Sequence, residues 1–206
     1  IARGDDGVMR LAYRAEIEYV GLQGFTLEEV FTDADTGDVI TRSPRIHRAL
    51  DRSIYNGNDL CMPSKLTLPA APMFSEGGAS SDVAATTAYQ NIGTTYHFLK
   101  SVLGRDSYDN KGALLRATVH LKFDAGPTCD TNSAFWLDAP YSQLVFGDGD
   151  GVTRYPTMNA LDITAHEFAH AITSGTSALK YTWEPGALNE AFSDIFGATV
   201  EAWSAS

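Results

Sequence analysis

Two histidines four residues apart, His166 and His170, enclose a glutamate in the pattern H-E-x-x-H. Residues at this spacing share one face when the chain is helical, because an α-helix turns by about 100° per residue. A helix from about residue 159 to about residue 174 would bring both imidazoles close enough to hold one metal ion, and neutral imidazole is a good zinc ligand. Glu167 would then point about a quarter-turn away, where it can flank an open position on the metal.

A second helix is predicted from about residue 187 to about residue 202, and it carries carboxylates that suit the same ion. Glu190 follows His170 by 20 residues and could be a third ligand. Asp194 lies one turn further on the same face, where it could accept the remaining N–H of a ligating histidine. Two histidines, a glutamate and a water make an open, catalytic type of zinc site. The alternative is a purely structural helix pair with surface histidines. It requires that Glu190 and Asp194 occupy their positions by chance.

The first half of the chain reads as strands followed by an irregular segment. Residues 11–20 alternate apolar and charged side chains, which predicts a strand with one buried face. Two short strands are expected around a turn at Thr36–Gly37. Between Ser43 and Ser81, several prolines and a Gly/Ser-rich stretch break the periodicity, which indicates an extended connection over a surface.

The second half combines one further helix with several strands, so the expected fold class is α+β. A helix is predicted over residues 81–104, with Ser81 or Asp82 as its cap and Gly104 at its end. Its expected core positions are Val83, Tyr89, Tyr96, Leu99 and Leu103. Strands are predicted at ALLRATVHLKF, SAFWLD and QLVFG. We interpret His97 and His120 as structural and GDGDG, residues 147–151, as a glycine-rich turn rather than a calcium loop.

The two cysteines and the net charge restrict the cellular location and the binding partners that we expect for the protein. Cys61 and Cys129 lie in polar, turn-rich segments, where free thiols would be exposed to oxidation. Two unrelated buried thiols are the alternative; the polar settings favour a disulfide and an oxidising, extracellular location. The formal net charge of −11 argues against nucleic acid or an anionic membrane as a partner.

The chain resembles the thermolysin-like zinc metalloproteases. The motif HEFAH followed by GALNEAFSDIFG carries the resemblance, and GRDSYDNKGA, SAFW and LVFGDGDG match family landmarks in the same order. The resemblance implies that residues 81–206 form the metalloprotease lobe, with β-strands followed by the two zinc helices. It also implies that residues 1–43 are the end of a propeptide with an antiparallel β-hairpin, joined by the connection of residues 44–80. The chain is therefore expected to be a zymogen or a processed piece of one.

The resemblance also assigns roles to individual residues. His166, His170 and Glu190 would bind zinc, Glu167 would be the general base, Asp194 would orient a ligand, and Tyr181 would hydrogen-bond the tetrahedral intermediate. Asp162 and Glu201 match two carboxylates of a calcium site. The segment that would pair with the substrate backbone consists of Asn132, Ser133, Ala134, Phe135 and Trp136. Ser133 stands where the family usually has an asparagine.

The expected function is zinc-dependent hydrolysis of peptide bonds by a secreted endopeptidase, with a peptide or protein as substrate. Expected partners are its own propeptide and a C-terminal helical domain, or a second chain that supplies it. In the family that domain brings a further catalytic histidine, and the sequence ends before it. Apolar residues on more than one side of the last helix favour such a partner: Leu188, Ala191, Phe192, Ile195, Phe196, Val200 and Trp203. The alternative is a non-catalytic, zinc-stabilised fragment that acts as a binding or inhibitory partner.

Overall fold

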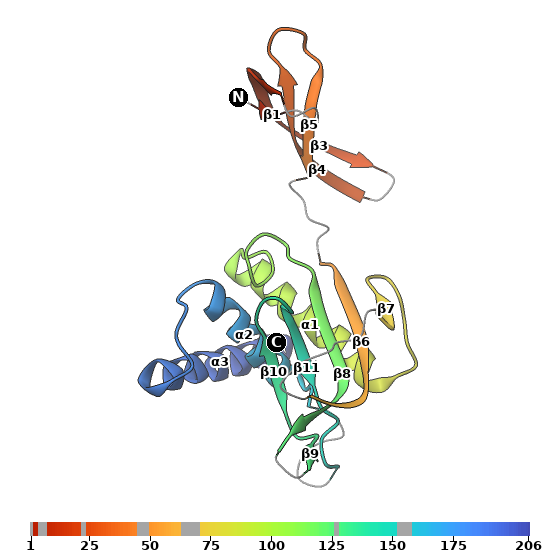
Figure 1. Ribbon diagram of the computed structural model, residues 1–206, viewed down its shortest axis with the longest axis vertical. Coiled ribbons are helices and arrows are strands. Elements are labelled where there is room, and N and C mark those ends of the chain that lie inside the picture. Colours follow the sequence, from red (N-terminus) through yellow and green to blue (C-terminus); the bar gives the residue numbers. More distant parts are fainter. Residues whose placement is uncertain are drawn as a thin grey trace. The chain divides into compact units, whose positions relative to one another are not determined.

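A computed structural model describes residues 2–3, 8–21, 24–44, 50–62, 71–125, 128–151 and 158–206 of the 206-residue chain. The chain divides into two compact units, residues 1–49 and residues 50–206, and each is described by itself (Figure 1). Strands and helices are both present, so the predicted α+β class is confirmed. Among the described residues, no helix combines the length and the hydropathy that a membrane crossing requires.

The first unit is built from antiparallel strands. Its elements are β1 (Ala2–Arg3), β2 (Met9–Arg10), β3 (Ala12–Gly21), β4 (Gly24–Asp33) and β5 (Val39–Pro44). β3, β4 and β5 form one sheet in this order, and β1 pairs with β2. The predicted turn between β4 and β5 is confirmed: Asp33 accepts the N–H groups of Asp35 and Thr36, and Gly37 adopts a positive φ of 79°. Glycine populates this region without steric cost.

The expected buried face of the first long strand is wrong. Leu11, Tyr13 and Ile17 are exposed, although residues 12–21 do form a strand. The described residues of this unit include no helix that could cover the sheet. Alternation along a strand therefore predicted the side chains that share a face, but it did not determine what covers that face.

The second unit contains a mixed sheet and three helices. Its strands are β6 (Arg52–Met62), β7 (Phe74–Ser75), β8 (Leu115–Asp124), β9 (Cys129–Asp130), β10 (Ala134–Leu137) and β11 (Gln143–Phe146), and its helices are α1 (Val83–Leu103), α2 (Leu161–Gly175) and α3 (Trp183–Ser204). The order across the sheet is β10-β11-β8-β6-β7, with β9 paired to β8. β6 and β8 run parallel, so α1 makes the crossover between them. The strands predicted in the second half of the chain are confirmed.

Helix α1 packs against β6 and β8 and forms the main core with them. Asp82 caps its first turn by accepting the N–H of Ala85 at 2.9 Å, and Gly104 ends it in the left-handed conformation, as predicted. Tyr96 and Leu99 are buried as expected, and Tyr89 packs against the core. Val83 and Leu103 are exposed, because they lie at the two ends of the helix and on its outer side.

The segment predicted as an extended connection contains the long strand β6. The first residues of β6, Arg52, Ser53 and Ile54, are all buried, so this part shows no alternation of polar and apolar residues. Two of them are polar and paired: Arg52 binds Glu76, and the hydroxyl of Ser53 contacts that of Ser75. The part of the connection at residues 63–70 lies outside the described residues.

The two C-terminal helices pack closely together. Helix α2 begins and ends within two residues of its predicted limits, whereas α3 begins at Trp183, four residues before its predicted start. A side chain at Gly197 would overlap the backbone oxygen of Asp162, so α3 approaches α2 where glycine permits it.

A disulfide joins the two cysteines. Cys61 on β6 and Cys129 on β9 are bonded with a Cα–Cα distance of 5.9 Å, as the polar settings of both residues predicted. The bond connects the end of β6 to the segment that leads into β10.

Candidate active site

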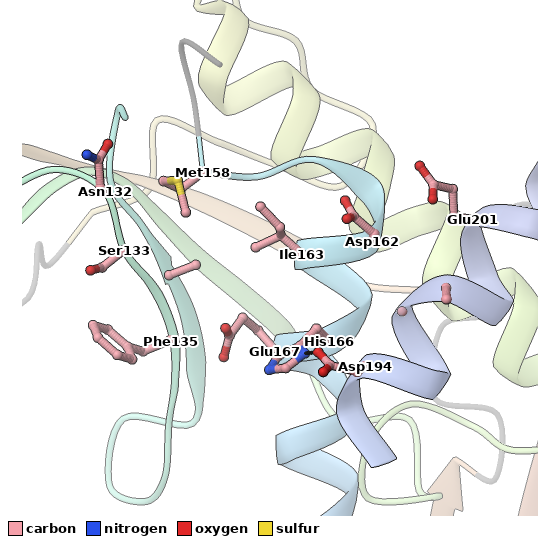
Figure 2. A pocket seen from close by; sticks show the side chains of 13 residues that line it. Asn132, Ser133, Phe135, Met158, Asp162, Ile163, His166, Glu167, Asp194 and Glu201 are labelled. Atoms are coloured by element: carbon pink, nitrogen blue, oxygen red, sulfur yellow. Dashed lines mark hydrogen bonds and ion pairs between the residues drawn. The ribbon is translucent and has the colours of Figure 1, made fainter. Parts of the chain in front are cut away.

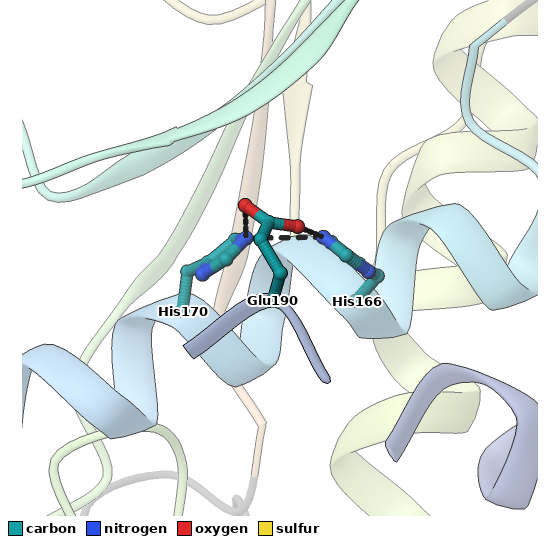
Figure 3. Close-up of side chains that lie close together, drawn as sticks. All are labelled: His166, His170 and Glu190. Carbon is teal, nitrogen blue, oxygen red and sulfur yellow. Dashed lines mark hydrogen bonds and ion pairs between the residues drawn. The ribbon is translucent and has the colours of Figure 1, made fainter. Parts of the chain in front are cut away.

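The two motif histidines and one glutamate converge on a single point (Figure 3). Nε2 of His166 lies 3.0 Å from Nε2 of His170. The carboxylate of Glu190 contacts both, at 3.2 Å from His166 and 3.6 Å from His170. Zinc with nitrogen and oxygen ligands at about 2.0–2.1 Å in a tetrahedron requires donor atoms about 3.3 Å apart. The three side chains are therefore spaced as zinc ligands would be.

The outer hydrogen bonds of the histidines support this fit. Nδ1 of His166 lies 2.9 Å from Oδ1 of Asp194, and Nδ1 of His170 lies 2.9 Å from Oδ1 of Asn189. Both partners are acceptors, so each Nδ1 donates a proton to its partner, and in that tautomer Nε2 offers a lone pair to a metal ion. Two such lone pairs and a carboxylate facing one another repel unless a cation lies between them. The residues present thus fit a zinc ion.

Glu167 lies beside this group in a protected position. The residue is 8% exposed, and its Oε2 accepts the backbone N–H of Trp136 at 2.9 Å. Burial raises the pKa of the Glu167 carboxyl to about 8; the Trp136 hydrogen bond opposes the shift and the charge of Glu190 adds to it. A carboxyl group with such a pKa can both take and return a proton near neutral pH.

Two connected hollows flank Glu167. One, of about 490 Å³, lies between the segment before β10 and helices α2 and α3 (Figure 2). The other, of about 1050 Å³, extends along β10 past His170 to Tyr181. Both are lined by Ala134, Phe135, His166 and Glu167, so together they form a groove that passes the candidate metal position.

All five residues of the predicted substrate segment line this groove. Asn132 and Ser133 lie on the wall opposite α2, and Phe135 is half-exposed beside them (Figure 2). Strand β10 pairs only with β11 among the described residues, so its other edge is open for an added strand. Trp136 contributes to the second hollow, and its ring packs at a tilt of 57° against that of Tyr108.

Tyr181 and the two expected calcium carboxylates lie around the rim. Tyr181 is 67% exposed, and its ring centre is 5.8 Å from that of His170. Asp162 and Glu201 line the first hollow at the end away from Glu167 (Figure 2). Among the described residues, His166, His170 and Glu190 form the only group of three side chains spaced to hold a metal ion. The two expected calcium carboxylates, Asp162 and Glu201, therefore lie at the same end of the groove, but among the described residues no third side chain completes a metal site with them.

Sequence patterns missed two residues that contact His170. Asn189 accepts the Nδ1 proton and donates to the carbonyl oxygen of Leu179, and the hydroxyl of Ser193 lies 3.2 Å from the same Nδ1. Both are buried on the side of α3 that faces α2. Asn189, Ser193 and Gly197 follow one another at intervals of four residues, and this spacing would have indicated that they share the face of α3 that packs on α2. The spacing does not reveal which side chain the two polar residues contact.

Comparisons with known proteins agree on one family. Residues 38–174 match the family model described as "Thermolysin metallopeptidase, catalytic domain", and residues 177–206 match "Thermolysin metallopeptidase, alpha-helical domain". The domain division expected from sequence, with residues 81–206 as one domain, stays a prediction.

Individual relatives are similar over much of the chain. A thermostable neutral protease of Geobacillus stearothermophilus is 42% identical over 151 residues, which cover 73% of this chain and 25% of that protein. A thermolysin of Alicyclobacillus acidocaldarius is 45% identical over 126 residues, which cover 61% and 21%. The chain spans about a quarter of the length of these curated relatives.

A solved structure shares the fold. It is a precursor of protealysin, a metalloproteinase from Serratia proteamaculans, with a TM-score of 0.63 and 35% sequence identity. The similarity covers 75% of this chain and 44% of that one.

Proposed function

The chain belongs to the thermolysin metallopeptidase family, and from this premise we propose that it carries the zinc site of a secreted endopeptidase. One observation carries the proposal: the donor atoms of His166, His170 and Glu190 lie 3.0–3.6 Å apart beside the buried carboxyl of Glu167. The names of its relatives support the reaction class, since they include proteases of the same family.

His166, His170 and Glu190 would hold the ion, while Asp194 and Asn189 keep the two imidazoles in the ligating tautomer. When bound, zinc supplies a Lewis acid that lowers the pKa of a water molecule and polarises a carbonyl group. Glu167 would accept the proton of the attacking water and then donate it to the leaving amine, because it is buried beside the candidate ligands and held by the N–H of Trp136.

The open edge of β10 would hold the substrate. An extended peptide can add to this edge as a further strand, with the carbonyl of Ala134 as one acceptor. Glu167 is hydrogen-bonded to the same strand through the N–H of Trp136, so the base would keep a fixed position relative to the substrate backbone. Tyr181 would donate its hydroxyl to the oxyanion, and its exposed position leaves the ring free to turn toward a bound peptide.

Other parts of the chain would complete a zymogen. Residues 1–43, which lie within the unit of residues 1–49, would be the end of the propeptide, and the similar solved structure is a metalloproteinase precursor. Asp162 and Glu201 would contribute to a calcium site, and the exposed residues Leu188, Phe192 and Ile195 of α3 would pack against further helical structure.

A direct experiment compares the wild-type chain with the Glu190→Gln variant. The wild type should contain about one zinc per chain and hydrolyse a peptide, and both properties should fall together in the variant because it loses a ligand charge. Wild-type protein that binds no zinc after dialysis against the metal would contradict the proposal. Zinc binding without hydrolysis would favour the alternative, a zinc-stabilised binding partner.

A further inference from the structure

His120 occupies an unusual place in the middle of β8. Its φ is 57°, in the left-handed region, and residues 57–59 of β6 stand opposite this single residue in the parallel pair. A non-glycine residue held in this conformation costs about 1 kcal/mol or more and persists only where its surroundings stabilise it. The contacts of the imidazole identify those surroundings.

Both ring nitrogens of His120 contact carboxylates. Nε2 lies 2.8 Å from Oδ2 of Asp82, and Nδ1 lies 2.7 Å from Oδ1 of Asp148. Carboxylates only accept hydrogen bonds, so both nitrogens must donate, and the ring is in its doubly protonated, cationic form. Burial lowers the pKa of His120, but Asp82 and Asp148 more than offset this effect, and the pKa ends above its usual value.

Two carboxylates from different elements contact this imidazole. Asp82 comes from the cap of α1, and Asp148 from the loop that follows β11. On the β6 side, residues 57–59 stand opposite His120, and the charged one among them, Asp59, pairs with Lys122 at 3.1 Å. The loss of one proton would therefore leave one carboxylate opposite a nitrogen lone pair.

Asp148 belongs to the loop of residues 147–151, and this loop holds the segment before β10. The N–H groups of Gly147 and Gly149 donate to the carbonyl oxygens of Ser133 and Thr131, each at 2.9 Å. The hydroxyl of Thr131 donates a hydrogen bond to the Gly149 carbonyl oxygen, and the side-chain amide of Asn132 donates one to the carboxylate of Asp150 at 3.0 Å. A side chain at residue 147 would overlap Thr131, so the two segments lie in direct contact.

We propose that protonated His120 is a positioning residue: through Asp148 it fixes the loop of residues 147–151, and thereby the groove wall formed by Asn132 and Ser133. Loss of the proton frees Asp148 or Asp82, and the wall loosens. The consequence for peptide binding rests on the proposed function, whereas the coupling between His120 and the loop does not depend on it.

Hydrogen exchange tests this coupling without substrate. From about pH 6 to about pH 9, protection of the Gly147 and Gly149 amides, corrected for intrinsic exchange, should fall about tenfold in the wild type. Asp148→Asn keeps an acceptor but removes the charge, so the midpoint should move down by about one pH unit. In His120→Gln the transition should disappear. His97→Gln, which removes an exposed histidine of α1, should behave as the wild type.

Peptide hydrolysis supplies the second measurement. KM should rise about tenfold over the same pH range in the wild type, and this change should be absent in His120→Gln, whereas the pH dependence of kcat should be retained. Protection that does not change with pH, or an Asp148→Asn midpoint equal to that of the wild type, would overturn the proposal. A chain without peptidase activity would still give the exchange result, so a failure of the proposed function can be distinguished from a failure of the coupling between His120 and the loop.

Discussion

The carboxylate of Glu167 accepts the backbone N–H of Trp136 at 2.9 Å and thereby links helix α2 to the edge strand β10. This bond uses a main-chain donor on the strand where we expect the substrate to pair. It also holds a carboxyl group that burial would otherwise make costly to ionise. The candidate base is therefore positioned by the backbone of the groove rather than by the metal ligands alone.

The raised pKa of Glu167 predicts a pH dependence of stability in the zinc-free chain. The folded pKa of about 8 lies above the ordinary glutamate value of 4.5, so the folded state binds the proton more tightly. This stabilisation is fully present below about pH 4.5 and is lost as the pH rises through about 8. Glu167→Gln should remove this part of the slope, which amounts to about 3 kcal/mol or less. Urea unfolding at a series of pH values would measure it; equal slopes in both proteins would contradict the assignment.

The close contact at Gly197 predicts an unusually sensitive position on α3. In Gly197→Ala, the new methyl group would meet the backbone oxygen of Asp162 at 2.6 Å, so α3 must shift away from α2. We expect a loss of about 1–3 kcal/mol in the free energy of unfolding and weaker zinc binding. Gly175→Ala is the matched control at the end of α2, where a methyl group meets nothing within 4 Å. Equal thermal unfolding midpoints for the two variants would be inconsistent with this packing.

The contacts of the histidine Nδ1 atoms predict that Asn189 and Asp194 tune metal affinity. Asn189→Ala and Asp194→Ala should each weaken zinc binding by about 10–100-fold, because each histidine loses the acceptor that fixes its tautomer. Competition with a chelator would measure the change, with His97→Gln as the control. Unchanged affinity in both variants would show that these contacts do not orient the ligands.

The metal ligands were predictable from sequence because their geometry is local. His166 and His170 lie one turn apart on a single helix, and Glu190 follows on the next helix along the chain. Strand β6 was not predictable in this way, since its pairing with β8 spans α1 and its first residues are buried on both faces, which removes alternation. The contact between His120 on β8 and Asp148 after β11 depends on the pairing of β8 with β11, which is also distant in the sequence, so the sequence alone suggested only a structural histidine.

The disulfide predicts a redox dependence of stability. Cys61 and Cys129 lie 68 residues apart and are the only cysteines in the chain, so a reductant acts on this bond alone. Closing a loop of this length stabilises the fold by about 4 kcal/mol. The double variant Cys61→Ser/Cys129→Ser should unfold at a lower temperature and lose its response to reductant. A wild-type protein whose unfolding is the same with and without reductant would argue against the bond.

The Glu167→Gln variant tests the central claim most directly, because it separates metal binding from turnover. Glu167 contacts Trp136 and does not belong to the three-ligand group, so the variant should retain about one zinc per chain. Its hydrolysis of a peptide substrate should fall by about 100-fold or more, since the general base is lost. Zinc content and kcat measured on the same preparation give the answer. Full zinc with low kcat is the predicted result; full zinc with wild-type kcat would contradict the account.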